Sequence, residues 1–143
     1  MKHHLFDDIA EEYDAWFDRH PTLYASELEA LRAFIPNEGE GLDIGTGTGR
    51  FAVELGIHTG IEPSLDMARI ARKRGLKVTI GRAEDLPFQD ESFDFAMMVT
   101  VVCFLDEPET AFREAFRVLK SGGRLIVGIL DRRGAIAQEY MKS

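Results

Sequence analysis

Cysteine is nearly absent from this sequence, because Cys103 is the only one among 143 residues. One thiol excludes an intramolecular disulfide and the metal sites that are built on paired cysteines. We therefore expect no metal, and we interpret Cys103 as a small apolar side chain of the interior. A reducing, cytoplasmic location is the default expectation for such a chain.

Long apolar runs are missing as well. The longest mainly apolar stretch, residues 93–105, contains Asp94, and it is shorter than the roughly 20 residues that a membrane-spanning helix needs. The N-terminus, Met-Lys-His-His-Leu-Phe-Asp-Asp, contains no apolar segment of the kind found in a secretory signal. We expect no membrane partner and no export.

Basic residues are too few to balance the acidic ones: 17 Lys and Arg stand against 25 Asp and Glu, for a formal net charge of −8. This charge repels phosphate backbones, so a nucleic-acid partner would require a local basic patch. The best candidate lies at the end of a predicted helix, where the helix dipole favours cations without any ligand. It consists of Arg69, Arg72, Lys73 and Arg74. We expect no nucleic-acid partner.

The proportions of apolar and charged residues are ordinary for a folded protein. Apolar residues make up 45% of the chain and charged residues 29%, which excludes a disordered chain. The length suits a single domain, which would bury roughly two thirds of the surface of its unfolded chain. Within it we expect an N-terminal helical cap, residues 1–36, and an α/β core, residues 37–143.

Two amphipathic helices are predicted for the cap, because apolar residues recur there at spacings of three and four. The first helix has the apolar stripe Leu5, Phe6, Ile9, Tyr13, Trp16 and Phe17. The second begins at Pro21 and ends at Pro36, with the stripe Tyr24, Leu28, Leu31 and Ile35.

Strands and helices alternate in the core. We expect strands at 42–44, 57–61, 76–80, 93–100 and 124–130. We expect helices at 50–55, at 64–74, and from an N-cap within 106–109 to a stop at 121–123. Alternation of this kind predicts an α/β fold with a doubly wound, mainly parallel sheet and right-handed crossovers.

The most specific motif is Gly-Leu-Asp-Ile-Gly-Thr-Gly-Thr-Gly-Arg, residues 41–50. An apolar strand leads into Gly45, Gly47 and Gly49, and a helix begins at once. Glycines allow a tight turn and a close approach of the backbone to a ligand. The start of the helix suits an anion, either a pyrophosphate or a carboxylate. The dinucleotide-binding pattern would have a glycine at position 50, where this chain has Arg50.

A carboxylate at the end of the second predicted strand supports a ligand site. Glu62 lies in Thr-Gly-Ile-Glu-Pro, 17 residues after Gly45. An acidic residue roughly 20 residues after the glycine turn takes the ribose hydroxyls of a bound nucleotide. A strand-end Glu alone is more often simply solvated, so the prediction depends on the two features together.

In this order and spacing, the motifs resemble those of the class I S-adenosylmethionine-dependent methyltransferases, in particular the small-molecule type. The likeness covers residues 6–130. It includes Phe-Asp-Asp-Ile-Ala-Glu-Glu-Tyr-Asp-Ala-Trp at 6–16, Ala-Glu-Asp-Leu-Pro-Phe at 83–88, Ser-Phe-Asp at 92–94 and Arg-Val-Leu-Lys-Ser-Gly-Gly at 117–123. The resemblance implies a Rossmann-like transferase with S-adenosylmethionine as its cofactor.

The resemblance also implies which residues bind that cofactor. It assigns the glycine turn to the methionine part, the strand-end carboxylate to the ribose, and the N-terminal helix to a cover over the site. Met67 would pack on the adenine and Thr100 would lie beside the sulfonium, although Met67 fits a plain core position equally well. The full set is Gly45, Thr46, Gly47, Gly49, Glu62, Pro63, Met67, Ala83, Glu84, Thr100, Tyr13 and Trp16.

The expected reaction is methyl transfer to a small-molecule acceptor by in-line displacement, in which positioning supplies most of the catalysis. No catalytic residue is assigned, because His20 and His58 form no recognisable pair with another group. The chain lacks the motifs of DNA methyltransferases, and it has Thr-Val-Val-Cys-Phe after the fourth strand. Two other classes stay open: a non-catalytic S-adenosylmethionine-binding or assembly module and, disfavoured by Arg50, a nicotinamide- or flavin-dependent oxidoreductase.

Few residues follow the fifth predicted strand. The family's sheet continues there with a helix and an antiparallel strand pair, for which residues 131–143 are too few. We therefore expect a fold truncated after the fifth strand, either as a fragment or as a form that a partner completes. The apolar edge at 124–130 is expected to stay unpaired, with a short helix over 135–141. A homodimer through this edge is one expected remedy.

Overall fold

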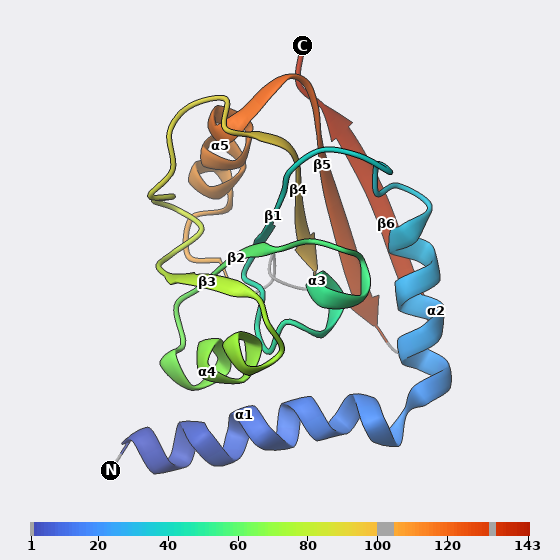
Figure 1. Ribbon diagram of the computed structural model, residues 1–143, viewed down its shortest axis with the longest axis vertical. Helices are drawn as coiled ribbons and strands as arrows, with labels where there is room; N and C mark the ends of the chain where they lie inside the picture. The colour runs from blue at the N-terminus through green and yellow to red at the C-terminus, as the bar shows by residue number, and fades with distance from the viewer. Residues whose placement is uncertain (1, 100–104, 132–133) are drawn as a thin grey trace.

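A computed structural model describes the backbone of residues 2–99, 105–131 and 134–143. Two helices come first, α1 (Lys2–Arg19) and α2 (Pro21–Arg32), which meet at a corner because Pro21 starts the second helix. Figure 1 shows α1 lying across one end of the sheet and α2 running along its side. Among the described residues, no helix is long and apolar enough to cross a membrane.

The core is one six-stranded sheet with the strand order β3-β2-β1-β4-β5-β6. The neighbours from β3 to β5 pair in parallel, and β6 is antiparallel to β5. This topology confirms the predicted doubly wound, mainly parallel sheet, since parallel neighbours require crossover connections. The strands are β1 (Gly41–Ile44), β2 (Thr59–Glu62), β3 (Lys77–Ile80), β4 (Phe93–Val99), β5 (Leu119–Asp131) and β6 (Gly134–Met141).

Helices cover both faces of the sheet. The crossovers carry α3 (Arg50–Glu54), α4 (Leu65–Lys73) and α5 (Pro108–Val118). Side chains of α5 pack on one face, and those of α1, α2, α3 and α4 pack on the other. Strand β4 contributes side chains to both faces: Phe95 and Met97 point to the second face, while Ala96 and Met98 point to the first. A sheet that is buried on both faces leaves the carboxyl ends of its strands as the natural place for a ligand.

The C-terminal residues contradict the expectation for this part of the chain. Instead of a helix over 135–141, β6 returns along β5 in register from Arg124 opposite Met141 to Asp131 opposite Gly134. A hairpin needs only a short turn. The residues after β5 are too few for a helix and a strand pair, but they are enough for one strand. The predicted unpaired edge of β5 is wrong, and so is the predicted end of the sheet after its fifth strand. The reason to expect a homodimer through β5 is removed.

The start of α5 agrees with the N-cap predicted within 106–109, and only the end of the helix differs from the prediction. Glu107 occupies the N-cap position and makes no side-chain cap hydrogen bond. Pro108 follows at the first helical position, where its missing N–H costs nothing. No stop at 121–123 separates helix from strand: β5 begins at Leu119, and an irregularity in its pairing with β4 lies between Phe93 and Phe95.

Candidate functional site

The three glycines form a turn that connects β1 to α3 at the carboxyl end of the sheet. Gly45, Gly47 and Gly49 have φ angles of 70°, 59° and 80°, in the left-handed region that favours glycine. The N–H groups of Gly45 and Thr46 both donate to the carbonyl of Ile61, at 2.9 and 3.0 Å. The turn is therefore tied to β2, next to the place where the strand order reverses and open α/β sheets bind ligands.

The glycines differ in what a side chain would meet. A Cβ at Gly49 would lie 3.0 Å from the Cβ of Ala71 on α4, so helix packing requires this glycine. A Cβ at Gly47 would meet Cε1 of Tyr13 at an ordinary contact distance of 3.8 Å. Gly47 therefore has room beside Tyr13, and its backbone is the part of the turn best suited to close approach by a ligand.

Glu62 joins the end of β2 to the glycine turn through its carboxylate. Oε1 accepts a hydrogen bond from the N–H of Gly47 at 2.9 Å, and Oε2 accepts one from the N–H of Ser64 at 2.8 Å. The residue is 7% exposed; burial raises the pKa of its carboxyl, while the two N–H donors act to lower it. A carboxylate has about four acceptor positions, so about two remain for the hydroxyl groups of a ligand.

Asp43 is a second buried carboxyl of the site, and the sequence reasoning did not single it out. It lies in β1, is 3% exposed, and accepts a hydrogen bond from the hydroxyl of Thr46 at 2.6 Å. Burial raises the pKa of Asp43 to about 7. The hydrogen bond from Thr46 acts to lower this pKa, and the charge of Glu62 acts to raise it. The hydroxyl of Thr46 is thus engaged within the protein, and Asp43 holds the first part of the turn.

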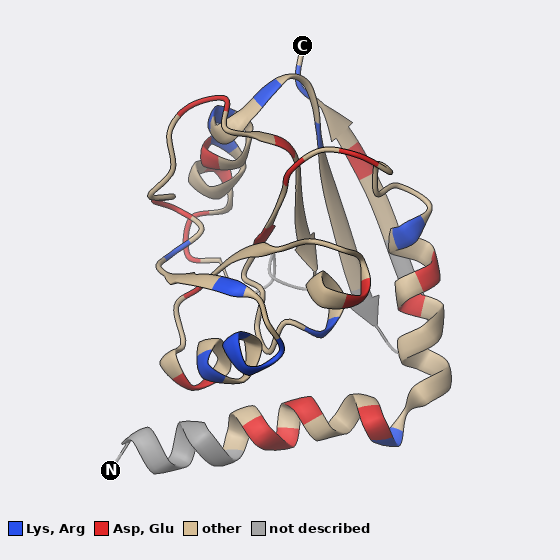
Figure 2. Cartoon of the chain, in the orientation of Figure 1, with Lys and Arg blue, Asp and Glu red and all other residues tan. Residues whose placement is uncertain are grey.

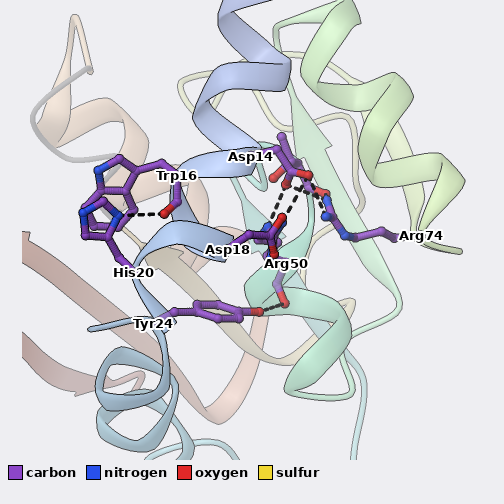
Figure 3. Close-up of polar contacts among 8 residues, drawn as sticks. Asp14, Trp16, Asp18, His20, Tyr24, Arg50 and Arg74 are labelled. Atoms are coloured by element: carbon purple, nitrogen blue, oxygen red, sulfur yellow. Dashed lines mark hydrogen bonds and ion pairs between the residues drawn. The ribbon is translucent and has the colours of Figure 1, made fainter. Parts of the chain in front are cut away.

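Asp14 holds α1 against the glycine turn through ion pairs. Its carboxylate accepts from Nε of Arg50 at 2.8 Å and from Nη2 of Arg74 at 2.7 Å, as Figure 3 shows. Arg50 also pairs with Asp18 at 2.9 Å, and Arg74 donates to the carbonyl of Thr48 at 2.8 Å. Burial acts to raise the pKa of Asp14, but the hydrogen bonds from Arg74 and Arg50 outweigh it and lower the pKa to about 2.

The ion pairs of Asp14 explain two features of the sequence. Arg50, which replaces the last glycine of the dinucleotide pattern, begins α3 and holds α1 in place. Arg74 belongs to the basic cluster at the end of α4, and Figure 2 shows this basic helix end facing the acidic stretch of α1. At least Arg74 of this cluster is therefore paired with a carboxylate of the same chain.

Other residues predicted to bind the cofactor lie after β2, on α4 and after β3. Met67 is half-buried on α4, Pro63 is exposed, and Ala83 is 7% exposed. Oε2 of Glu84 accepts from the N–H groups of Asp106 at 3.1 Å and of Glu107 at 3.4 Å, so this side chain holds the start of α5. The position predicted for the sulfonium end, Thr100, lies outside the described residues.

Tyr13 and Trp16 lie on α1 with partly exposed rings. They line an open surface cavity of about 580 Å³ together with Ile9, Glu12 and Arg19. Trp16 stacks on His20, with 4.1 Å between the ring centroids. The structure thus brings Tyr13 to the glycine turn, while Trp16 lies at the cavity.

Comparison with known proteins identifies the family. The sequence model of the family described as "Methyltransferase domain" matches residues 42–127. This chain belongs to that family. The methyltransferase domain is 58% identical to an S-adenosylmethionine-dependent methyltransferase of Thermotoga maritima, described as a possible histamine N-methyltransferase. The match has a TM-score of 0.84 and covers 90% of this chain and 62% of the other.

Two curated relatives extend the comparison. The uncharacterized protein MJ1123 of Methanocaldococcus jannaschii is 52% identical over 95% of this chain and 66% of its own length. A demethylmenaquinone methyltransferase of Roseiflexus castenholzii is 41% identical over 62% of this chain and 41% of its own. This methyltransferase domain therefore spans less than two thirds of the length of these relatives.

The family uses S-adenosylmethionine, and the site observed in this methyltransferase domain fits that cofactor. The turn leaves room at Gly47 where a larger residue would carry a side chain. Glu62 retains acceptor positions at the end of β2, as a ribose diol requires. S-adenosylmethionine is the cofactor that these residues would hold.

Proposed function

We propose that this domain transfers the methyl group of S-adenosylmethionine to a small-molecule acceptor by in-line displacement. The observation that carries the proposal is the hydrogen bond from Gly47 to Glu62, which joins the glycine turn and the strand-end carboxylate in one site. When bound, the cofactor supplies a methyl carbon that its sulfonium already activates. The contribution of the chain is then to bind, orient and exclude water.

The resemblance to the family supports the following cofactor contacts. The backbone of Gly45, Thr46 and Gly47 faces the methionine part, and the carboxylate of Glu62 accepts the ribose hydroxyls. Gly49 supports the turn by its packing on α4. For the adenine and its surroundings we propose Pro63, Met67, Ala83 and the backbone of Glu84, with Tyr13, Trp16 and Thr100 toward the reacting end.

Two measurements test this function. Calorimetry with S-adenosylhomocysteine and, separately, with NADH should show binding of the first alone. A methyl-transfer screen over small amines, acids and phenols should then find turnover with at least one class. Binding of NADH without S-adenosylhomocysteine would replace the proposal with an oxidoreductase.

A non-catalytic S-adenosylmethionine-binding or assembly module is the second candidate. Tight binding of S-adenosylhomocysteine with no turnover in the screen would support this candidate over the enzyme.

A further inference from the structure

Glu27 places a carboxyl group in the interior of the described structure. It lies in α2 and is 6% exposed. Within the described part of the chain, its Oε2 atom has no hydrogen-bond partner. Burial raises the pKa of this carboxyl to about 7. A buried acid without compensation costs stability, which indicates a use for it.

The position of Glu27 points toward the candidate site. Leu31, one helical turn later, lies against β5: a Cβ at Gly128 would be 2.9 Å from Cδ2 of Leu31. Residues four apart share a helix face, so Glu27 also faces the sheet. Because α2 leads to the amino end of β1, its earlier residues lie toward the carboxyl end of the strands, where α1 crosses the sheet in Figure 1.

Tyr13 lies beside the glycine turn and is also close enough to Glu27 for the charge of Glu27 to act on its hydroxyl. Its ring lies 3.8 Å from the Cβ position of Gly47. Burial, and next the charge of Glu27, raise the pKa of the Tyr13 hydroxyl to about 12, and Asp43 and Glu62 act in the same direction. Above about pH 7, where Glu27 and Asp43 are ionised, the carboxylates around this hydroxyl form a negative region at the site. The nearby cations Arg50 and Arg74 are engaged by Asp14.

A negative region beside aromatic rings favours one class of ligand. A cation gains from the carboxylate and also from the faces of aromatic side chains. The rings of Tyr13 and Trp16 line the cavity on α1 and suit an apolar or aromatic body. A neutral or anionic acceptor would leave Glu27 uncompensated.

We propose that Glu27 binds the methyl acceptor, and that this acceptor is an amine carried on an apolar body and bound as its ammonium ion. The inference rests on the proposed function, whose acceptor it specifies. Before its nitrogen can be methylated, the ammonium must lose one proton, and Glu27 takes it. The N–H bond breaks, its electron pair stays on nitrogen, and the carboxylate becomes a carboxylic acid.

Calorimetry on the full chain with saturating S-adenosylhomocysteine tests the proposal. The probes are phenethylamine and its neutral isostere 2-phenylethanol. Wild-type protein should bind the amine at least about tenfold more tightly, as a hydrogen bond to a charged group implies. Glu27→Gln should lose this preference, and Glu29→Gln, which changes an exposed residue of the same helix, should keep it.

A second measurement does not depend on the variants. In the wild-type protein, the side-chain carboxyl ¹³C resonance of Glu27 should shift on addition of phenethylamine and stay in place with 2-phenylethanol. An equal preference in Glu27→Gln, or no preference in the wild type, would overturn the role of Glu27. Failure of S-adenosylhomocysteine to bind wild-type protein would instead contradict the proposed function.

Discussion

At the scale of single residues, Glu62 joins the end of β2 to the glycine turn. Its two oxygens accept from Gly47 and Ser64, so it supports the turn in addition to the ribose contact proposed for it. The sequence indicated the second role through spacing from the glycines. The first role required coordinates, because no pattern shows which N–H groups a strand-end carboxylate will meet.

Replacing Glu62 with alanine should therefore have two effects. The affinity for S-adenosylhomocysteine should fall at least about tenfold, because hydrogen bonds to a charged group are lost. Stability should fall by about 1–3 kcal/mol, because two N–H groups lose their acceptor. Calorimetry and urea unfolding measure the two effects, with Glu62→Gln as the matched variant that keeps one acceptor oxygen. Unchanged affinity in Glu62→Ala would mean that the ribose is held elsewhere.

Two glycines of the same turn should respond differently to valine. Gly47→Val should abolish detectable binding of S-adenosylhomocysteine, because the side chain enters the space beside Tyr13. Gly49→Val should have the lower melting temperature of the two, because its Cβ would press on Ala71 at 3.0 Å. Both variants carry the cost of a left-handed φ. Native affinity in Gly47→Val would show that the turn is structural only.

At the scale of elements, α1 is held to the core by the ion pairs of Asp14 together with the packing of Phe17 on Phe51. Of the residues predicted to form the apolar stripe of α1, Phe17 is buried, whereas Ile9, Tyr13 and Trp16 are 48%, 42% and 37% exposed. The helix itself was predictable from periodicity. Periodicity did not predict that Asp14, a residue of the predicted polar face, would also meet the core through Arg50 and Arg74.

The Asp14 pairs should make the stability of the protein depend on acid pH. The pKa of Asp14 falls from 3.8 to about 2 on folding, which corresponds to about 2 kcal/mol. Because the folded pKa is the lower one, this stabilisation is complete above about pH 4 and is lost as the pH falls through 2. Urea unfolding of wild type and Asp14→Asn should differ at pH 6, and the difference should shrink toward pH 2. A constant difference would contradict the assignment.

At the scale of the whole molecule, β6 closes the edge of the sheet that the sequence had suggested was open. Its eight residues pair with β5 from Arg124 to Asp131, so that backbone groups along this edge are satisfied within the chain. Self-association through β5 then requires that β6 first be displaced.

Removing β6 should expose that edge. A variant ending at Asp131 should associate or aggregate at concentrations where the 143-residue chain does not, because an apolar strand with unpaired N–H and C=O groups is a template for another chain. Light scattering over a concentration series measures this difference. Equal behaviour of the two proteins would show that β6 does not protect the edge.

The sequence by itself determined the order of strands and helices as far as β5, the parallel part of the sheet, and the expectation that the glycine turn and Glu62 belong to one site. These features depend on periodicity and on spacing within one crossover, which are local properties of the chain. The tertiary structure alone decided that Asp14 meets Arg50 and Arg74, at sequence separations of 36 and 60 residues. It also decided the hairpin of β5 with β6 and the burial of Glu27. Such contacts depend on how helices and strand edges pack against one another, and many packings satisfy the same hydrophobic pattern.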